Sequence, residues 1–113
     1  SEEGEGEGLS LIKGKVVKFP NNIKIPHMGW NLVIPKNKSR LLSNIDGKIW
    51  AYFAHSYFPQ PEDKSIIKGV TIYGIQFPSV IENNNVFGTQ FHPEKSGTTG
   101  RIILENFVNM VKR

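Results

Sequence analysis

Ile49-Trp50-Ala51-Tyr52-Phe53-Ala54-His55 is the most apolar stretch of the chain and the best guide to its architecture. It is continuously apolar or aromatic up to the histidine. Such a run is typical of a β-strand that is buried on both faces, between layers. A strand of that kind needs helices on both sides, and the remaining sequence predicts only one long helix. We therefore expect a covering layer that this chain does not supply, with residues 49–54 left undercovered.

Outside this run, the sequence predicts a strand-rich fold. Clusters of Pro, Asn and Gly divide it into short apolar segments of strand-like composition. These further strands are expected over residues 14–19, the second half of 27–34, 70–73, 75–80 and 86–91.

One long helix is expected over residues 101–111. Its apolar residues recur at helical spacing and predict a single buried stripe of Ile103, Phe107 and Val111, widened by Leu104 and Val108. The preceding residues 96–100 are expected as a loop in which Thr98 or Thr99 caps the helix. Ser39 is expected to cap one short helical turn.

The composition narrows the class of protein. The length of 113 residues is typical of one domain. The chain has no cysteine, which excludes disulfides and thiolate metal sites, and its three histidines lack metal-ligand spacing. We expect no metal and no cofactor. No apolar run approaches the ~20 residues of a membrane-spanning helix, so we expect no membrane contact and a cytoplasmic protein.

The charge is unevenly distributed along the chain. The net charge is +4, yet residues 1–8 carry four glutamates and no basic residue. This acidic, glycine-rich segment is expected to be a flexible lead-in, with the domain proper over residues 9–113. The lysines of the domain are scattered, which favours a solvated surface over a nucleic-acid site.

The segment Gln90-Phe91-His92-Pro93-Glu94 carries the strongest chemical signal. A predicted strand delivers His92 at its end, where Pro93 prevents further strand pairing. In extended geometry, Glu94 would point to the same side as His92. Its carboxylate could then hold one imidazole nitrogen and leave the other as a base, which is two-thirds of a nucleophile–His–acid triad. A strand-end histidine hydrogen-bonded in a loop has the same spacing, so spacing alone does not decide.

The longer run Phe-Gly-Thr-Gln-Phe-His-Pro-Glu-Lys-Ser, residues 87–96, resembles the signature of class I (triad) glutamine amidotransferases. Within that family it is most similar to the glutaminase subunits of imidazole glycerol phosphate synthases, from histidine biosynthesis. The resemblance extends from about Gly8 to the C-terminus. It is also carried by Pro26-His27-Met28-Gly29-Trp30-Asn31, by Phe53-Ala54-His55-Ser56-Tyr57 and, in the last helix, by Gly100, Leu104, Asn106 and Phe107.

The resemblance implies a fold and a set of roles. The fold is the C-terminal half of a flavodoxin-like, three-layer α/β/α domain. His92 is implied as the general base and Glu94 as the group that orients it. Ser56 and Tyr57 are implied to hold the α-amino and α-carboxylate groups of the substrate glutamine.

The resemblance also implies a partner, a cyclase subunit with a (β/α)8-barrel fold that receives ammonia from glutamine. The residues implied at that interface are Pro26, Met28, Trp30, Tyr57 and Lys95. From the residue types alone, Met28 and Trp30 could equally be ordinary residues of the hydrophobic core. His55 is interpreted as structural rather than as a second base.

The chain departs from the family pattern at the nucleophile. The family uses a cysteine on a strand-to-helix elbow, which lies N-terminal to the point where the resemblance begins. We therefore expect the C-terminal half of a domain that lacks this elbow, without glutaminase activity by itself and prone to poor solubility or self-association.

Three alternatives stay open at this stage. The chain could be a non-catalytic binding protein that keeps the amidotransferase surface, or it could belong to a different class I amidotransferase. It could also be a small nucleic-acid-binding β-domain in which Trp30, Trp50, Tyr52 and Phe53 stack on bases. The apparent burial of residues 50–53 argues against this last interpretation.

Overall fold

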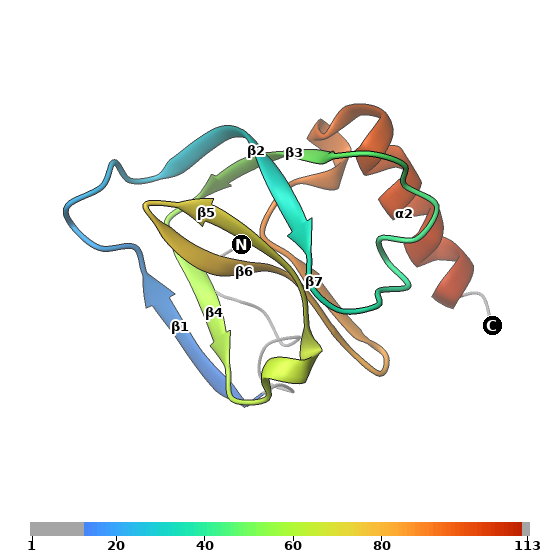
Figure 1. Ribbon diagram of the computed structural model, residues 1–113, viewed down its shortest axis with the longest axis horizontal. Helices are drawn as coiled ribbons and strands as arrows, with labels where there is room; N and C mark the ends of the chain where they lie inside the picture. The colour runs from blue at the N-terminus through green and yellow to red at the C-terminus, as the bar shows by residue number, and fades with distance from the viewer. Residues whose placement is uncertain (1–12, 112–113) are drawn as a thin grey trace.

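The computed structural model describes residues 13–111, and the predicted lead-in over residues 1–8 lies outside this range. Within these residues, seven strands, two short 3-10 turns and one long helix follow one another, as Figure 1 shows. They are β1 (Gly14–Lys18), β2 (His27–Pro35), β3 (Ile49–His55), β4 (Tyr57–Pro61), η1 (Lys64–Ile66), β5 (Ile67–Tyr73), β6 (Ile75–Asn83), β7 (Val86–Thr89), η2 (Pro93–Lys95) and α2 (Gly97–Val111).

The strands form two sheets. The larger has five strands in the order β3-β2-β5-β6-β7, and β1 pairs with β4 in a separate two-stranded sheet. All of these pairs are antiparallel. Phe91, two residues beyond β7, forms a single bridge with Phe53 of β3. This bridge joins the two ends of the larger sheet and brings the signature segment back against the apolar strand.

Most predicted strands are present, and one strand was missed. Gly74 forms the turn between β5 and β6 with a φ of 74°, and Asn84 forms the next turn with a φ of 56°, as their residue types predict. The missed strand is β4, which contains Pro59 and Pro61. Prolines argue against a central strand but are tolerated at an edge, and among the described strands β4 pairs with β1 alone.

The prediction that β3 is buried on both faces is wrong for this chain. Ala51, Phe53 and His55 are buried, whereas Trp50 is 47% exposed and the residues at 52 and 54 are partly exposed. The strand therefore alternates, with one face on the core and one face outward. Aromatic residues stand at both kinds of position, which concealed the alternation in the sequence. The expected undercovering of residues 49–54 is confirmed on the outward face.

The core lies on the inward face of the larger sheet and under β1 and β4. Its largest completely buried side chains are those of Phe19, Phe53 and Phe77. The Phe77 ring packs edge to face against both of the other rings, and all three rings contact the buried His55. The aromatic cluster fixes the end of β3 at which the chain turns into β4.

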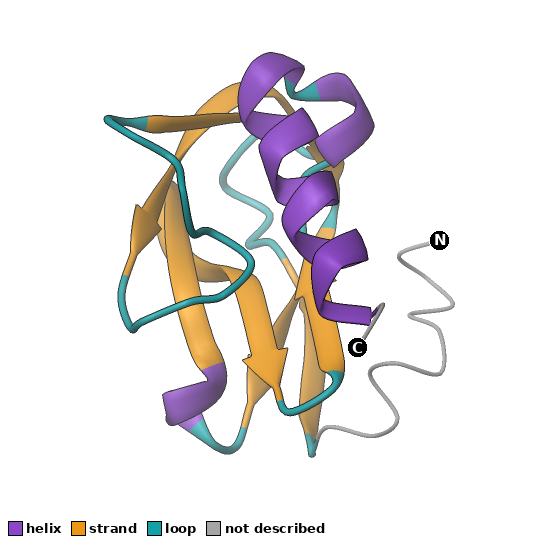
Figure 2. Ribbon diagram, turned by 90° about the vertical axis from the view of Figure 1, so that its right-hand side faces the viewer, coloured by secondary structure: helices purple, strands orange, loops and turns teal. Residues whose placement is uncertain are grey.

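Helix α2 lies along one side of the strands (Figure 2) and begins before the predicted start. Thr98 and Thr99 are already helical, so neither is the cap. The predicted buried stripe is confirmed at Ile103 but wrong at Phe107 and Val111, which are 39% and 56% exposed. The helix is buried instead through Gly100, Ile103 and Asn106.

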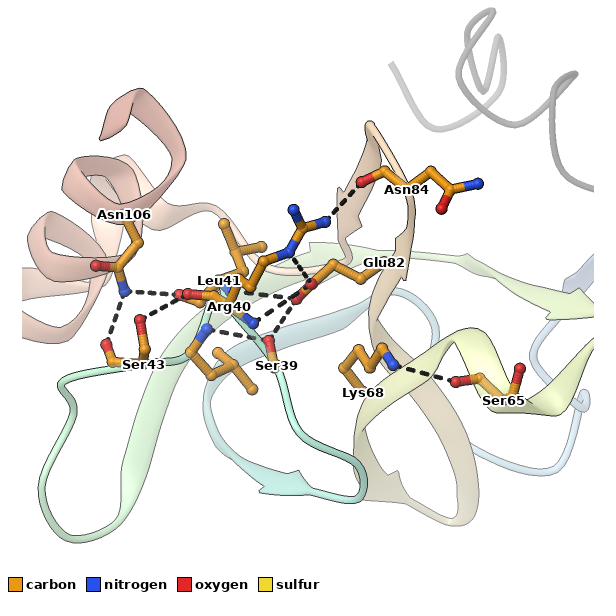
Figure 3. Close-up of polar contacts among 10 residues, drawn as sticks. Ser39, Arg40, Leu41, Ser43, Ser65, Lys68, Glu82, Asn84 and Asn106 are labelled. Atoms are coloured by element: carbon orange, nitrogen blue, oxygen red, sulfur yellow. Dashed lines mark hydrogen bonds and ion pairs between the residues drawn. The ribbon is translucent and has the colours of Figure 1, made fainter. Parts of the chain in front are cut away.

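Polar contacts fasten the loop before β3 to the sheet and to the helix (Figure 3). Glu82 is buried and accepts hydrogen bonds from the Ser39 hydroxyl, from Arg40 and from the Leu41 amide. Burial raises the pKa of this carboxyl, but the hydrogen bonds outweigh burial and the net shift is downward. Asn106 donates to the carbonyls of residues 41 and 43. Ser39 also accepts from the Leu42 amide, the predicted capping contact.

Candidate active site

His92 stands where the signature segment leaves the sheet. Its amide donates to the Tyr52 carbonyl over 2.9 Å, next to the bridge between Phe53 and Phe91. The backbone then turns at Pro93, which opens η2 with His92 as the residue before its first turn. The regular strand β7 already ends at Thr89, and Pro93, which has no N–H, prevents pairing beyond His92.

His92 and Glu94 contact each other directly. The imidazole Nδ1 lies 3.2 Å from the carboxylate Oε2. The two side chains meet across the 3-10 turn η2 rather than along an extended strand, so the route predicted for the contact is wrong although the contact itself is present. A carboxylate that accepts from Nδ1–H leaves the Nε2 lone pair as the base. The side chains are 40% and 60% exposed, open to a reacting group.

Ser96 holds this turn in place, a role that the sequence did not reveal. Its hydroxyl accepts from the Tyr52 amide over 3.0 Å and donates to the His92 carbonyl over 2.7 Å. The side chain is 2% exposed. A buried hydroxyl that bridges β3 and η2 fixes the position of His92 relative to β3. The one sign of this role in the sequence was a serine four residues after the histidine, and a serine at that spacing is also common in ordinary loops.

Gly100 allows helix α2 to approach the same turn. A Cβ atom at this position would overlap the Pro93 carbonyl oxygen. The amide of Gly100 donates to the Ser96 carbonyl over 3.1 Å. The absence of a side chain therefore lets the first turn of α2 support the turn that carries Glu94.

Ser56 and Tyr57 follow the last residue of β3, whereas His92 lies beside the middle of that strand. Ser56 forms the bend between β3 and β4, and Tyr57 is the first, half-buried residue of β4. Tyr52 pairs with the backbone of His92. At about 3.3 Å per residue, the four residues from 52 to 56 place the bend roughly 13 Å away. The structure therefore brings His92 and Glu94 together and leaves the two predicted substrate-binding residues at a distance along the strand.

The outward face of β2 and β3 carries an apolar surface. Met28 is 61% and Trp30 55% exposed, so the plain-core interpretation of these two residues is wrong. Trp30 is the register partner of Tyr52, and their rings contact edge to face. Because His92 bonds to Tyr52 from the other side, this surface borders the candidate catalytic pair.

The other residues predicted at a partner interface are also accessible. Pro26 and Lys95 are exposed, the first just before β2 and the second in η2 beside Glu94. His55 is buried and hydrogen-bonded, which agrees with its structural interpretation. Within residues 13–111, no cluster of three metal-ligating side chains is found, and no helix is long and apolar enough to cross a membrane.

Comparison with known proteins identifies the family of this chain. The family model for class I glutamine amidotransferases matches residues 8–111. The chain therefore belongs to the class I glutamine amidotransferase family.

Curated relatives point to one branch of this family. The chain is 50% identical over 112 residues to the imidazole glycerol phosphate synthase subunit HisH of Methanocaldococcus jannaschii, covering 98% of this chain and 57% of that protein. It is 47% identical over 106 residues to the HisH subunit of Desulfitobacterium hafniense, covering 94% of this chain and 50% of that protein. The chain thus spans about half the length of the curated relatives that it matches.

A solved structure shares the fold. A protein of Thermoplasma acidophilum, described as a putative GMP synthase subunit, superposes with a TM-score of 0.69. The match covers 88% of this chain and 49% of that one, at 19% sequence identity. At this identity the likeness concerns the fold alone. It agrees with the predicted fold class, a strand-rich part of a class I amidotransferase domain with one long C-terminal helix.

Proposed function

We propose that this chain supplies the base and the orienting acid of a triad glutaminase, in the glutaminase subunit of an imidazole glycerol phosphate synthase. The observation that carries the proposal is the 3.2 Å contact between His92 Nδ1 and Glu94 Oε2 across the exposed 3-10 turn η2. Family membership and the HisH relatives support it. Residues 9–113 then form the C-terminal part of the amidotransferase domain.

The proposed chemistry needs a thiol from outside this sequence, because the chain has no cysteine. Glu94 holds the Nδ1–H of His92, and Nε2 takes the proton from that thiol. The thiolate attacks the side-chain carbonyl of glutamine. His92 returns the proton to the departing ammonia, and water then hydrolyses the thioester to release glutamate.

The surrounding residues take the other proposed roles. Ser56 and Tyr57 bind the α-amino and α-carboxylate groups of glutamine at the far end of β3. The surface formed by Pro26, Met28, Trp30, Tyr57 and Lys95 faces a cyclase subunit with a (β/α)8 barrel, which receives the ammonia. An accessible apolar surface of this kind suits a protein partner, and it lies next to the proposed source of ammonia.

The test combines this chain with the N-terminal, cysteine-bearing part of the M. jannaschii relative and its cyclase partner, and measures glutamine hydrolysis. We expect the mixture to hydrolyse glutamine and the isolated chain to be inactive. His92→Ala should lower the rate by about 10³-fold or more, and Glu94→Gln by about 10²–10⁴-fold.

The matched control is Glu105→Gln, on the surface of α2, where Glu105 pairs with the exposed Arg101. This variant should keep the unaltered rate. Hydrolysis that survives His92→Ala would refute the catalytic assignment. A mixture that binds the cyclase but releases no ammonia would favour the non-catalytic binding protein.

A further inference from the structure

Two histidines that the proposed chemistry does not use meet in the core. His27 on β2 and His55 on β3 are register partners and are 2% and 3% exposed. The Nδ1 atom of His27 lies 2.9 Å from the Nε2 atom of His55. Two buried imidazoles in direct contact demand an arrangement of protons in which one ring donates and the other accepts.

The neighbour of His27 sets the direction of this bond. The Asn31 Oδ1 atom accepts a hydrogen bond from the Leu32 amide, and its Nδ2 atom donates one to the Ile72 carbonyl. These two bonds fix the orientation of the Asn31 side-chain amide. The same Nδ2 lies 3.2 Å from His27 Nε2. His27 Nε2 must therefore accept, so the proton of a neutral His27 sits on Nδ1 and points at His55.

The hydrogen bond of His55 to Tyr57 agrees with a proton donated from His27 to His55. His55 Nδ1 lies 2.9 Å from the Tyr57 carbonyl, which can only accept. The proton of His55 therefore sits on Nδ1, and its Nε2 accepts the hydrogen of His27. Both rings are satisfied as neutral Nδ1–H tautomers in a single chain of hydrogen bonds from Asn31 to Tyr57.

The surroundings of His27 oppose a charge on its ring. His27 is stacked between Phe53 and Tyr73, with ring centroids 4.7 and 4.2 Å away, and Phe19 meets both imidazoles edge-on. Tyr73 is the titratable group in this stack, and its hydroxyl donates to the Lys24 carbonyl. Burial, followed by repulsion from His55, lowers the pKa of His27 to about 4.

The bond from His55 spans the bend at which the chain leaves β3 for β4. At the same bend, the Ser56 carbonyl accepts from the Phe19 amide over 3.1 Å. We propose that His27 and His55 are positioning residues, a neutral and directionally hydrogen-bonded imidazole pair that holds the Ser56–Tyr57 bend in register with β2. The expected effect of this pair on glutamine binding rests on the proposed function, whereas its role in holding the bend does not.

The arrangement links two surfaces of the molecule. Met28, next to His27, faces outward on the proposed partner surface, while His27 reaches inward toward the bend. The pair therefore ties the partner-facing strand to the residues proposed to hold glutamine.

The first test is the tautomeric state of the rings in the ¹⁵N-labelled chain, read from long-range ¹H–¹⁵N correlations at pH 7. We expect His27 and His55 both to be neutral with the proton on Nδ1. A cationic ring, or an Nε2–H tautomer at either position, would overturn the proposed pair.

The second test measures hydrogen exchange of the Phe19 amide, which reports on the bend through its bond to Ser56. His55→Leu removes the donor to the Tyr57 carbonyl and should speed this exchange about tenfold. His55→Asn places an amide N–H near the position of Nδ1 and should restore slow exchange. The control Val80→Ala alters a completely buried residue of β6 and should leave the Phe19 amide protected. Equal effects of His55→Leu and His55→Asn would show a merely structural role.

The third test measures KM for glutamine in the mixture described above. His55→Leu should raise KM about tenfold with a smaller change in kcat, and His55→Asn should stay near the unaltered value. An unchanged KM would refute the link to substrate binding. If the unaltered mixture hydrolyses no glutamine, the proposed function fails, and the tautomers and the Phe19 exchange decide the positioning role separately.

Discussion

At the scale of single residues, the hydroxyl of Ser96 holds the backbone of His92 in position. It joins the Tyr52 amide to the His92 carbonyl from a position that is almost completely buried. We expect Ser96→Ala to lower the free energy of unfolding by about 1–3 kcal/mol, because two backbone groups lose their partner. Urea denaturation measures the change.

The control for this variant is Ser43→Ala. The Ser43 hydroxyl donates to the Arg40 carbonyl at an exposed position, where water can replace it. Its removal should change the free energy of unfolding by less than about 0.5 kcal/mol. A Ser96→Ala change as small as this would contradict the bridging role.

His27 makes stability depend on pH. Its pKa is about 4 in the folded chain, below the usual 6.5. Between these values the unfolded chain binds a proton that the folded chain does not. Stability should therefore be complete above pH 6.5 and fall as the pH drops toward 4, by up to about 1.4 kcal/mol per pH unit.

Denaturation curves between pH 7 and 4 test this dependence. Replacing the imidazole by an uncharged group, in His27→Gln, should flatten the slope in this range even though it lowers stability at pH 7. Glu82, whose pKa is lowered, acts in a more acidic range, since its contribution is lost only below the usual carboxyl pKa of 4.5. A slope that is unaffected by His27→Gln would assign the titration to another group.

At the scale of elements, the contact between η2 and the first turn of α2 decides where Glu94 points. A methyl group at Gly100 would overlap the Pro93 carbonyl. Gly100→Ala should therefore cost at least about 2 kcal/mol of stability, despite the higher helix propensity of alanine, and should displace η2. The displacement would be seen as changed ring shifts of His92.

Gly88→Ala is the matched control. A Cβ atom at Gly88 in β7 meets nothing within 4 Å, and its φ is not in the left-handed region. This variant should leave the His92 shifts unchanged and alter stability by less than about 1 kcal/mol. If both variants behave alike, close packing at Gly100 is not what places η2.

At the scale of the whole molecule, the outward face of β2 and β3 determines how the chain behaves in solution. Trp30 and Trp50 are 55% and 47% exposed on this face. An apolar surface of this kind promotes association. We expect the isolated chain to self-associate at high concentration, and Trp30→Lys with Trp50→Lys to reduce that association. Sedimentation velocity over a range of concentrations measures it.

A control must separate the loss of apolar surface from the gain of charge. Asn21→Lys adds a lysine at an exposed turn between β1 and β2, outside the strands that form this face. It should leave the association unchanged. A compact monomer for the unaltered chain at all concentrations would refute the prediction.

The local sequence pattern was sufficient to predict the features that depend on residues close together in the sequence. The turns at Gly74 and Asn84 follow from the left-handed backbone that these residues tolerate. The contact between His92 and Glu94 joins residues two apart, so the sequence could predict it even though the turn that creates it was misjudged. Residues 87–96 were also sufficient to indicate the family.

Only the tertiary structure decided which faces are buried and which distant groups meet. Phe107 and Val111 have the pattern of a core stripe, yet α2 is buried through Gly100 and Asn106 because those residues fit η2 and the loop before β3. His27 meets His55 across 28 positions of sequence, and Ser96 reaches Tyr52 across 44. Such pairs depend on strand register and on the docking of elements, and periodicity within one element contains no information on either.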